Sequence, residues 1–509
     1  MKKFEDLLLI TDISNLTGKE QVDIVGELFD LSFDNNSISG ISKAFDLIGQ
    51  IQIEELSAPL QTLLYYDIAN GYGYLRKLKY FNTPDSWNFE MEEISHEVFH
   101  LRKAIASLGF EEIDDLRKCQ IYTNLGNTFS FIGRFIEAQE YWRKALNIFP
   151  NFPMALANSG HGLMFYSNQI FDNSHKLYFI NYGYHKIIEA LHFKEYLEGD
   201  AANQFHKMKS YMDATYDVKI LSEQFNLNSF EFGDNEKLNN YRYWCLENYL
   251  YINPLNDLGA SKFASHDCLN LPSLILETKA PPTYFTLYNQ LKQEFATARY
   301  FYYKSVVFQD SHFSDEDVVI VDTMESALFS YNLELAKSAF RNTYSILDKI
   351  AYFLNDYLKL GNNYNRVNFR SVWFKKDNKT LHEHFQNSQN WALRGLFWLS
   401  KDFFIKEHDE VLDPDSKQIA ELRNSIEHKG LKIMYDTYLY SNFFNADKEI
   451  IFIINRDDFE SKTLRLLKTV RAAIMYLAFI INYEEGQKES NGLPTLPMNL
   501  SEVPIYMKF

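Results

Sequence analysis

A helical pattern in the last fifth of the chain carries a guanidinium, an amide and an imidazole close together. Asn424 and His428 are four residues apart and therefore share one helical face, whereas Arg423 points about 140° away from His428. Histidine titrates near neutrality and can transfer protons, and the planar guanidinium of arginine matches phosphate oxygens. A flexible arginine can sweep across part of that angle. A compact polar cluster is therefore feasible, most simply where two such helices meet.

A structural interpretation of the same residues stays open. Arg423 could pair with Glu427, four residues further along a solvated helical face, while His428 caps the helix or packs. Both interpretations need the same helix, so helical spacing alone does not decide between them.

Other groups of reactive residues are weaker candidates. His382 and His384 are two residues apart with no clear third ligand, which makes a poor metal site. His266 and Cys268 are too close along the chain to face one another as base and nucleophile, so packing is the better interpretation. The three cysteines form no Cys-x-x-Cys pair, and no Gly-x4-Gly-Lys-Ser/Thr phosphate loop is present. We therefore predict no metal and no cofactor.

The charge balance restricts the partners of the chain. Its 509 residues include 51 Lys and Arg against 68 Asp and Glu, a net charge of −17. Such a surface repels phosphate backbones on average, so any nucleic-acid site must be a local basic cleft. The late apolar stretch over 472–481 is about half of the ~20 residues needed to cross a bilayer, and the first residues lack a signal core. We expect a cytoplasmic protein with no membrane partner.

The elements that must position the polar cluster are helices. Aromatic residues make up 16% of the chain, whereas Gly (20) and Pro (12) are scarce, which favours long, closely packed helices and predicts an all-α fold with at most a short strand. In region 311–509 we expect a helix over about 322–360 ended by Gly361, a helix over 391–404, a helix beyond Pro414 capped by Asp415 or Ser416, a strand over 449–454, and a last helix that opens with Asp457 and Glu460 and runs to about Tyr483.

The amino-terminal part contains a repeat-like unit. Two helical patterns between Cys119 and Pro150 are joined by a turn at Gly133, and Gly126 is placed to let the second helix approach at Ala138. The order of aromatic, Leu-Gly, Ala and Pro positions resembles a tetratricopeptide repeat. A second unit after Pro153 keeps Gly160 but has Asp172 where a small residue is expected, and an earlier unit is predicted over 63–74 and 91–108. One repeat cannot bury its own apolar face, so its neighbours must stack on it.

We therefore predict three regions. Residues 1–210 form an irregular, tetratricopeptide-like helical solenoid, 211–310 form a connector rich in Tyr and Asn, and 311–509 form a helical bundle. The solenoid is either a scaffold or a concave surface that binds a peptide or protein, and both interpretations stay open.

The carboxyl-terminal region resembles the HEPN family of ribonucleases and toxins. The resemblance rests on Arg423, Asn424 and His428 in a late helix and on flanking segments in the two preceding helices. Those segments are Phe340-Arg341, Leu347-Asp348-Lys349-Ile350-Ala351, Ala392-Leu393-Arg394-Gly395-Leu396 and Ser400-Lys401-Asp402. The middle segment, Trp244-Cys245-Leu246 followed by Asn253-Pro254-Leu255-Asn256-Asp257, looks like the connector of a subgroup that joins tetratricopeptide repeats to this domain.

The resemblance implies a metal-independent endoribonuclease in which two copies pair and bring their Arg-and-His helices into one cleft. His428 would then transfer protons, Arg423 would hold the scissile phosphate, and Asn424 would position neighbouring groups. Lys429 and Lys432 would contact RNA phosphates or be ordinary surface lysines. The implied biology is an RNA-cleaving effector in antiviral defence or a toxin system, restrained or triggered by the repeat region.

A non-catalytic function is the alternative. HEPN-like domains include inactive members, and the acidic net charge of −17 suits a protein whose repeat face captures a peptide or protein while the terminal domain only dimerises. This alternative predicts that Arg423 and His428 are dispensable.

Overall fold

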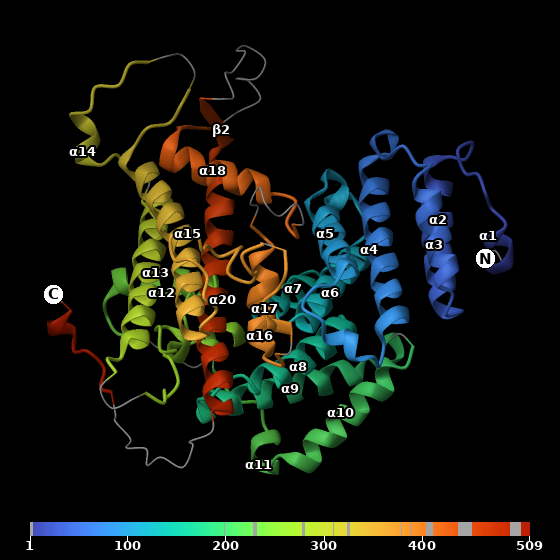
Figure 1. Ribbon diagram of the computed structural model, residues 1–509, viewed down its shortest axis with the longest axis horizontal. Helices are drawn as coiled ribbons and strands as arrows, with labels where there is room; N and C mark the ends of the chain where they lie inside the picture. Colours follow the sequence, from blue (N-terminus) through green and yellow to red (C-terminus); the bar gives the residue numbers. More distant parts are fainter. Residues whose placement is uncertain are drawn as a thin grey trace.

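The computed structural model describes residues 4–197, 199–227, 232–276, 280–308, 310–322, 326–377, 379–386, 388–403, 411–435, 450–488 and 500–508. Most of the described chain is helical (Figure 1), which confirms the all-α prediction. Its sheet pairs two short strands. Within these residues no helix is long and apolar enough to span a membrane.

The first half of the chain is a stack of helix pairs. Consecutive helices pack on one another from α4 to α9, and α2 packs on both α3 and α4. The helices are α1 (Phe4–Leu8), α2 (Gly18–Asp34), α3 (Ile38–Ile48), α4 (Ala58–Tyr80), α5 (Glu92–Ala106), α6 (Asp115–Phe131), α7 (Phe135–Ile148), α8 (Pro153–Ser167), α9 (Asn173–His192), α10 (Ala201–Thr215) and α11 (Val218–Leu221). Helix-pair stacking in this region agrees with the solenoid that we predicted.

The α6–α7 pair has the predicted turn at Gly133, whose φ of +88° favours glycine. The close approach at Gly126 differs from the prediction, because the nearest partner is the indole of Trp142 and not Ala138. A Cβ at Gly126 would lie 2.7 Å from Trp142 Nε1. The helix pair was predicted, whereas the close contact of Gly126 with Trp142 was not.

The α8–α9 pair also keeps a small residue at its contact. A Cβ at Gly160 would lie 2.7 Å from the carbonyl oxygen of Gly183. Asp172, which we expected at a small-residue position, instead caps α9 and accepts hydrogen bonds from the backbone N–H groups of Ser174 and His175. This unit is therefore more regular than its sequence indicated.

The second half is a bundle around α20. Helices α13, α15 and α20 pack together, α17 packs on α20, and α18 packs on α15 and the two strands (Figure 1). The elements are α12 (Glu236–Glu247), α13 (Thr283–Val307), α14 (Phe313–Glu316), α15 (Tyr331–Tyr357), α16 (Glu383–Gln386), α17 (Trp391–Ser400), α18 (Ser416–His428), β1 (Gly430–Met434), β2 (Ile451–Asn455) and α20 (Arg456–Gln487). Helix α13, within the predicted connector, is thus in contact with the bundle.

Several elements of the bundle begin or end at residues other than those predicted. Helix α15 begins at Tyr331 and not near 322, because the side chain of Ser330 accepts the N–H of Leu333. Helix α20 is capped by Asn455, which accepts the N–H of Asp457, so the predicted Asp457 cap is wrong. Residue 449 of the predicted strand and residue 404 of the predicted helix lie outside the described residues. The parallel partner of β2, strand β1, was not predicted.

A buried ionic cluster joins the two halves of the chain. The carboxylate of Asp402, just after α17, accepts paired hydrogen bonds from Arg102 on α5 at 2.6 and 3.0 Å. Arg134, at the α6–α7 turn, donates a second pair at 2.9 and 2.7 Å and also pairs with Glu137. Burial alone would raise the pKa of Asp402, but the two arginines outweigh it and hold the pKa well below its ordinary value.

Backbone contact reinforces this junction. A Cβ at Gly133 would lie 2.2 Å from the carbonyl oxygen of Trp391, and one at Gly395 would lie 2.1 Å from the carbonyl oxygen of Gly133. Both positions must therefore be glycine for the α6–α7 turn to lie against α17. The buried guanidinium of Arg394 donates to the carbonyl oxygens of Phe131 and Asn88.

We expect Asp402→Asn to lower the free energy of unfolding by about 3–5 kcal/mol, because it leaves two buried guanidinium groups without their carboxylate. Urea denaturation followed by circular dichroism measures this loss. Since the native pKa of Asp402 is depressed, the wild-type advantage is present above pH ~4 and shrinks as the pH falls below that value.

Asp213→Asn is the matched control. Asp213 pairs with Lys209 on the exposed side of α10, and its removal should cost about 1 kcal/mol or less. Equal unfolding midpoints for Asp402→Asn and wild type would contradict the structural importance of the buried cluster.

Candidate active site on helix α18

Helix α18 has one buried face and one exposed face. Ile419, Leu422 and Ser425 are buried, and Ile426 packs partly against the core. The opposite face exposes Arg423, Asn424, Glu427 and His428. The apolar spacing of three and four residues that holds α18 on the bundle therefore also directs the polar cluster outwards.

Arg423 lies against helix α15. Its guanidinium carbon is 5.0 Å from the ring centroid of Tyr344, and Nη2 is 3.9 Å from Oδ2 of Asp348. Burial raises the pKa of Tyr344 to about 12 and also raises the pKa of Asp348, against a hydrogen bond from the N–H of Phe369 and the charge of Arg423. The ring and the carboxyl group thus orient Arg423 while 44% of its side chain stays exposed.

The alternative Arg423–Glu427 pair is not formed. Among the described residues, the ion pair of Arg423 is with Asp348. The side chains of Asn424 and His428 make no hydrogen bond or ion pair with any part of the chain that the structure describes, and both are exposed. Within the described residues, His428 therefore neither packs in the core nor uses its ring nitrogens in a structural hydrogen bond.

The two lysines beside the motif differ in setting. Lys429 is exposed and extended at the end of α18, where the chain enters β1. Lys432 is half-buried on β1, opposite Ile453 of β2. Lys429 thus adds positive charge at the surface next to His428, whereas only part of Lys432 reaches solvent.

The other reactive residues lie in structural settings. The Nε2 atom of His382 is 3.1 Å from Oδ1 of Asn362, whereas His384 faces Glu484. Burial raises the pKa of Cys268 to about 11, so the thiol stays protonated at neutral pH. No group of three or more His, Cys, Asp or Glu side chains is placed to hold a metal ion within the described residues.

Sequence reasoning missed the residues that orient Arg423. Asp348 was named only within a segment of family resemblance, and neither Tyr344 nor Asp348 was predicted to contact Arg423. Their spacing of four residues on α15 placed both on one helical face, which was the available signal. Their contact with Arg423, however, joins residues that are about 75 positions or more apart along the chain.

Comparison with known families agrees with the sequence resemblance in the second half of the chain. Residues 275–484 match the family described as LA2681-like HEPN. The matched range contains α13, α15, α17, α18, both strands and most of α20, and hence the candidate site. The helical region before it has no family assignment. No curated protein and no solved structure matches the chain.

We expect His428→Ala to leave the free energy of unfolding within about 0.5 kcal/mol of wild type, because the side chain is exposed and has no structural contact among the described residues. Leu422→Ala on the same helix should cost about 2–5 kcal/mol, because Leu422 is fully buried. Thermal and urea unfolding of both variants test this difference. A large loss for His428→Ala would assign that residue a structural role.

Proposed function

We propose that residues 275–484 act as a metal-independent endoribonuclease of the HEPN type. The observation that carries the proposal is the exposure of Arg423, Asn424 and His428 along one helix within the range that matches a HEPN family. A solvated imidazole and a half-exposed guanidinium on adjacent turns are available to a ligand.

The reaction that suits these groups is attack by the 2′-hydroxyl of RNA on the adjacent phosphate. The 2′-oxygen forms a bond to phosphorus while the bond to the 5′-oxygen breaks, so one proton leaves the nucleophile and another reaches the leaving group. His428 is the group for proton transfer, a contribution of typically 10²–10⁴ in rate. Arg423 holds the phosphate oxygens and their developing charge, and Asn424 positions the neighbouring groups.

We propose that two copies of the domain form the active site together. The reaction needs both a base and an acid, and the described residues of each chain supply one imidazole, that of His428, on α18. A pair of α18 helices would bring together two imidazoles and two guanidinium groups, with Lys429 and Lys432 beside them for RNA phosphates. Pairing also concentrates positive charge locally, which a chain with a net charge of −17 needs in order to bind RNA.

The amino-terminal helix stack is proposed as the regulator of this nuclease. Its junction with α17 through Asp402 gives a route by which a peptide or protein bound to the stack would act on the bundle. In this proposal the protein is a cytoplasmic effector, toxic when released, that serves in antiviral defence or as a toxin.

The nuclease proposal is tested by incubating purified protein with total RNA in the presence of EDTA. We expect cleavage by wild type and a loss of 10²–10⁴ in rate for His428→Ala. Glu427→Ala, on the same exposed turn, is the matched control and should cut at the wild-type rate. Intact RNA with wild type, or equal cutting by His428→Ala, would leave the non-catalytic protein-binding alternative.

The shared site is tested by mixing wild type with an excess of His428→Ala under conditions that allow subunit exchange. A mixed pair keeps only one of the two imidazoles, so we expect less cleavage than the same amount of wild type gives alone. Unchanged cleavage, despite mixed pairs detected by native mass spectrometry, would place the complete site within one copy.

A further inference from the structure

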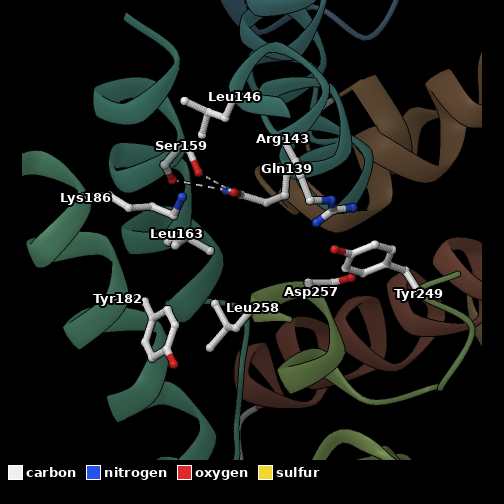
Figure 2. Close-up of a pocket in the computed structure, with 10 residues that line it drawn as sticks. All are labelled: Gln139, Arg143, Leu146, Ser159, Leu163, Tyr182, Lys186, Tyr249, Asp257 and Leu258. Carbon is white, nitrogen blue, oxygen red and sulfur yellow. Dashed lines mark hydrogen bonds between the residues drawn. The ribbon is translucent and has the colours of Figure 1, made fainter. Parts of the chain in front are cut away.

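A small cavity lies between the amino-terminal helix stack and the chain segment that precedes the bundle. Its volume is about 80 Å³, and it is bounded by α7, α8, α9 and the short 3₁₀ helix η5 (Pro254–Leu258), as Figure 2 shows. This space is large enough for several water molecules, and hence for a small oxyanion. It is remote in sequence from the polar cluster on α18 and serves no step of the proposed RNA cleavage.

Two cations line this cavity without an ion pair to a carboxylate among the described residues, although Glu140 lies within the electrostatic reach of Arg143 and Glu189 within that of Lys186. Arg143 on α7 lies over the ring of Tyr249, with its guanidinium carbon 3.5 Å from the ring centroid, and Lys186 on α9 lies across the cavity (Figure 2). Within the described residues neither side chain forms an ion pair or a hydrogen bond. Burial lowers the pKa of Lys186, the exposed Glu189 opposes that shift, and Arg143 adds to it.

The acidic residue of the lining is already neutralised. Asp257 accepts a hydrogen bond from Arg471 of α20 at 2.7 Å and one from the hydroxyl of Tyr166 at 2.8 Å. Its charge is therefore offset by Arg471 and does not balance Arg143 and Lys186. The cavity keeps an excess of positive charge.

The remaining polar wall is held in place by hydrogen bonds of its own. Ser159 Oγ lies 2.8 Å from Oε1 of Gln139, and Nε2 of Gln139 donates to the carbonyl oxygen of Ser159 (Figure 2). These bonds fix α7 against α8 beside the two cations. These hydrogen bonds therefore position Gln139 and Ser159 without a ligand, whereas the charges of Arg143 and Lys186 are not balanced within the lining.

We propose that this cavity binds a phosphate group, with Arg143 as a planar donor and Lys186 as a point charge. A phosphate dianion matches two cations that have no ion pair among the described residues, whereas a single carboxylate would match one. The cavity has room for the phosphate itself and not for a whole nucleotide, so any attached nucleoside must extend outwards. Because Asp257 connects the wall to α20, an occupied cavity would also strengthen the contact between the helix stack and the bundle.

Isothermal titration of the full chain at pH 7 and low salt tests this site, with inorganic phosphate and adenosine monophosphate as separate probes. We expect binding to wild type, affinity at least tenfold weaker in Arg143→Gln and in Lys186→Gln, and no change in Lys207→Gln, which alters an exposed lysine of α10. Tighter binding of the monophosphate would identify a phosphate ester as the source, and equal binding would identify free phosphate.

Thermal unfolding separates loss of the site from loss of the fold. Lys186→Gln removes a half-buried cation that forms no ion pair among the described residues, so it should not lower the unfolding temperature of the free protein, whereas phosphate should raise that temperature in wild type only. Absence of binding by wild type, equal binding of acetate, or full binding by both variants would overturn the proposal. None of these outcomes depends on RNA cleavage, so the nuclease is judged separately.

Discussion

The pairing of the Asp402 carboxylate with two buried arginines is the interaction on which the architecture depends. Two buried guanidinium groups, from Arg102 and Arg134, approach it from different helices of the amino-terminal stack, and each donates two hydrogen bonds. Buried charges are costly unless they are paired, so the three groups hold one another in place. The glycine contact between the α6–α7 turn and α17 adds a backbone fit that admits no side chain. Stack and bundle therefore dock in one specific arrangement.

Some of the segments that carry the family resemblance take part in this docking. The segments around Arg394, Gly395 and Asp402 resemble HEPN sequences, yet their side chains and backbone contact the helix stack and not the polar cluster. Within α17 these residues thus pack against the amino-terminal helix stack. The candidate site lies instead on α18, which packs on α15.

Local periodicity predicted much of the fold and the placement of the candidate site. Helical spacing gave the α6–α7 pair with its turn at Gly133, and it put Asn424 and His428 on one face of a helix beyond Pro414. Long-range pairing was not accessible in the same way. Strand β1 is defined by its parallel partner about 20 residues later, and the contact of Arg423 with Tyr344 and Asp348 depends on how α15 and α18 pack.

Arg423 differs in setting from the two arginines that bind Asp402, and the difference supports a ligand-binding role for Arg423. Arg102 and Arg134 are buried and use their planar donors on Asp402 in paired hydrogen bonds. Arg423 is half-exposed, and its distance of 3.9 Å from Asp348 is longer than a hydrogen bond. Burial raises the pKa of Asp348, so this attraction is lost at a higher pH than for an exposed carboxyl group, while the ring of Tyr344 still orients the guanidinium. The guanidinium of Arg423 is thus oriented, but no carboxylate forms a hydrogen bond with it among the described residues. Its N–H donors remain available to an incoming phosphate.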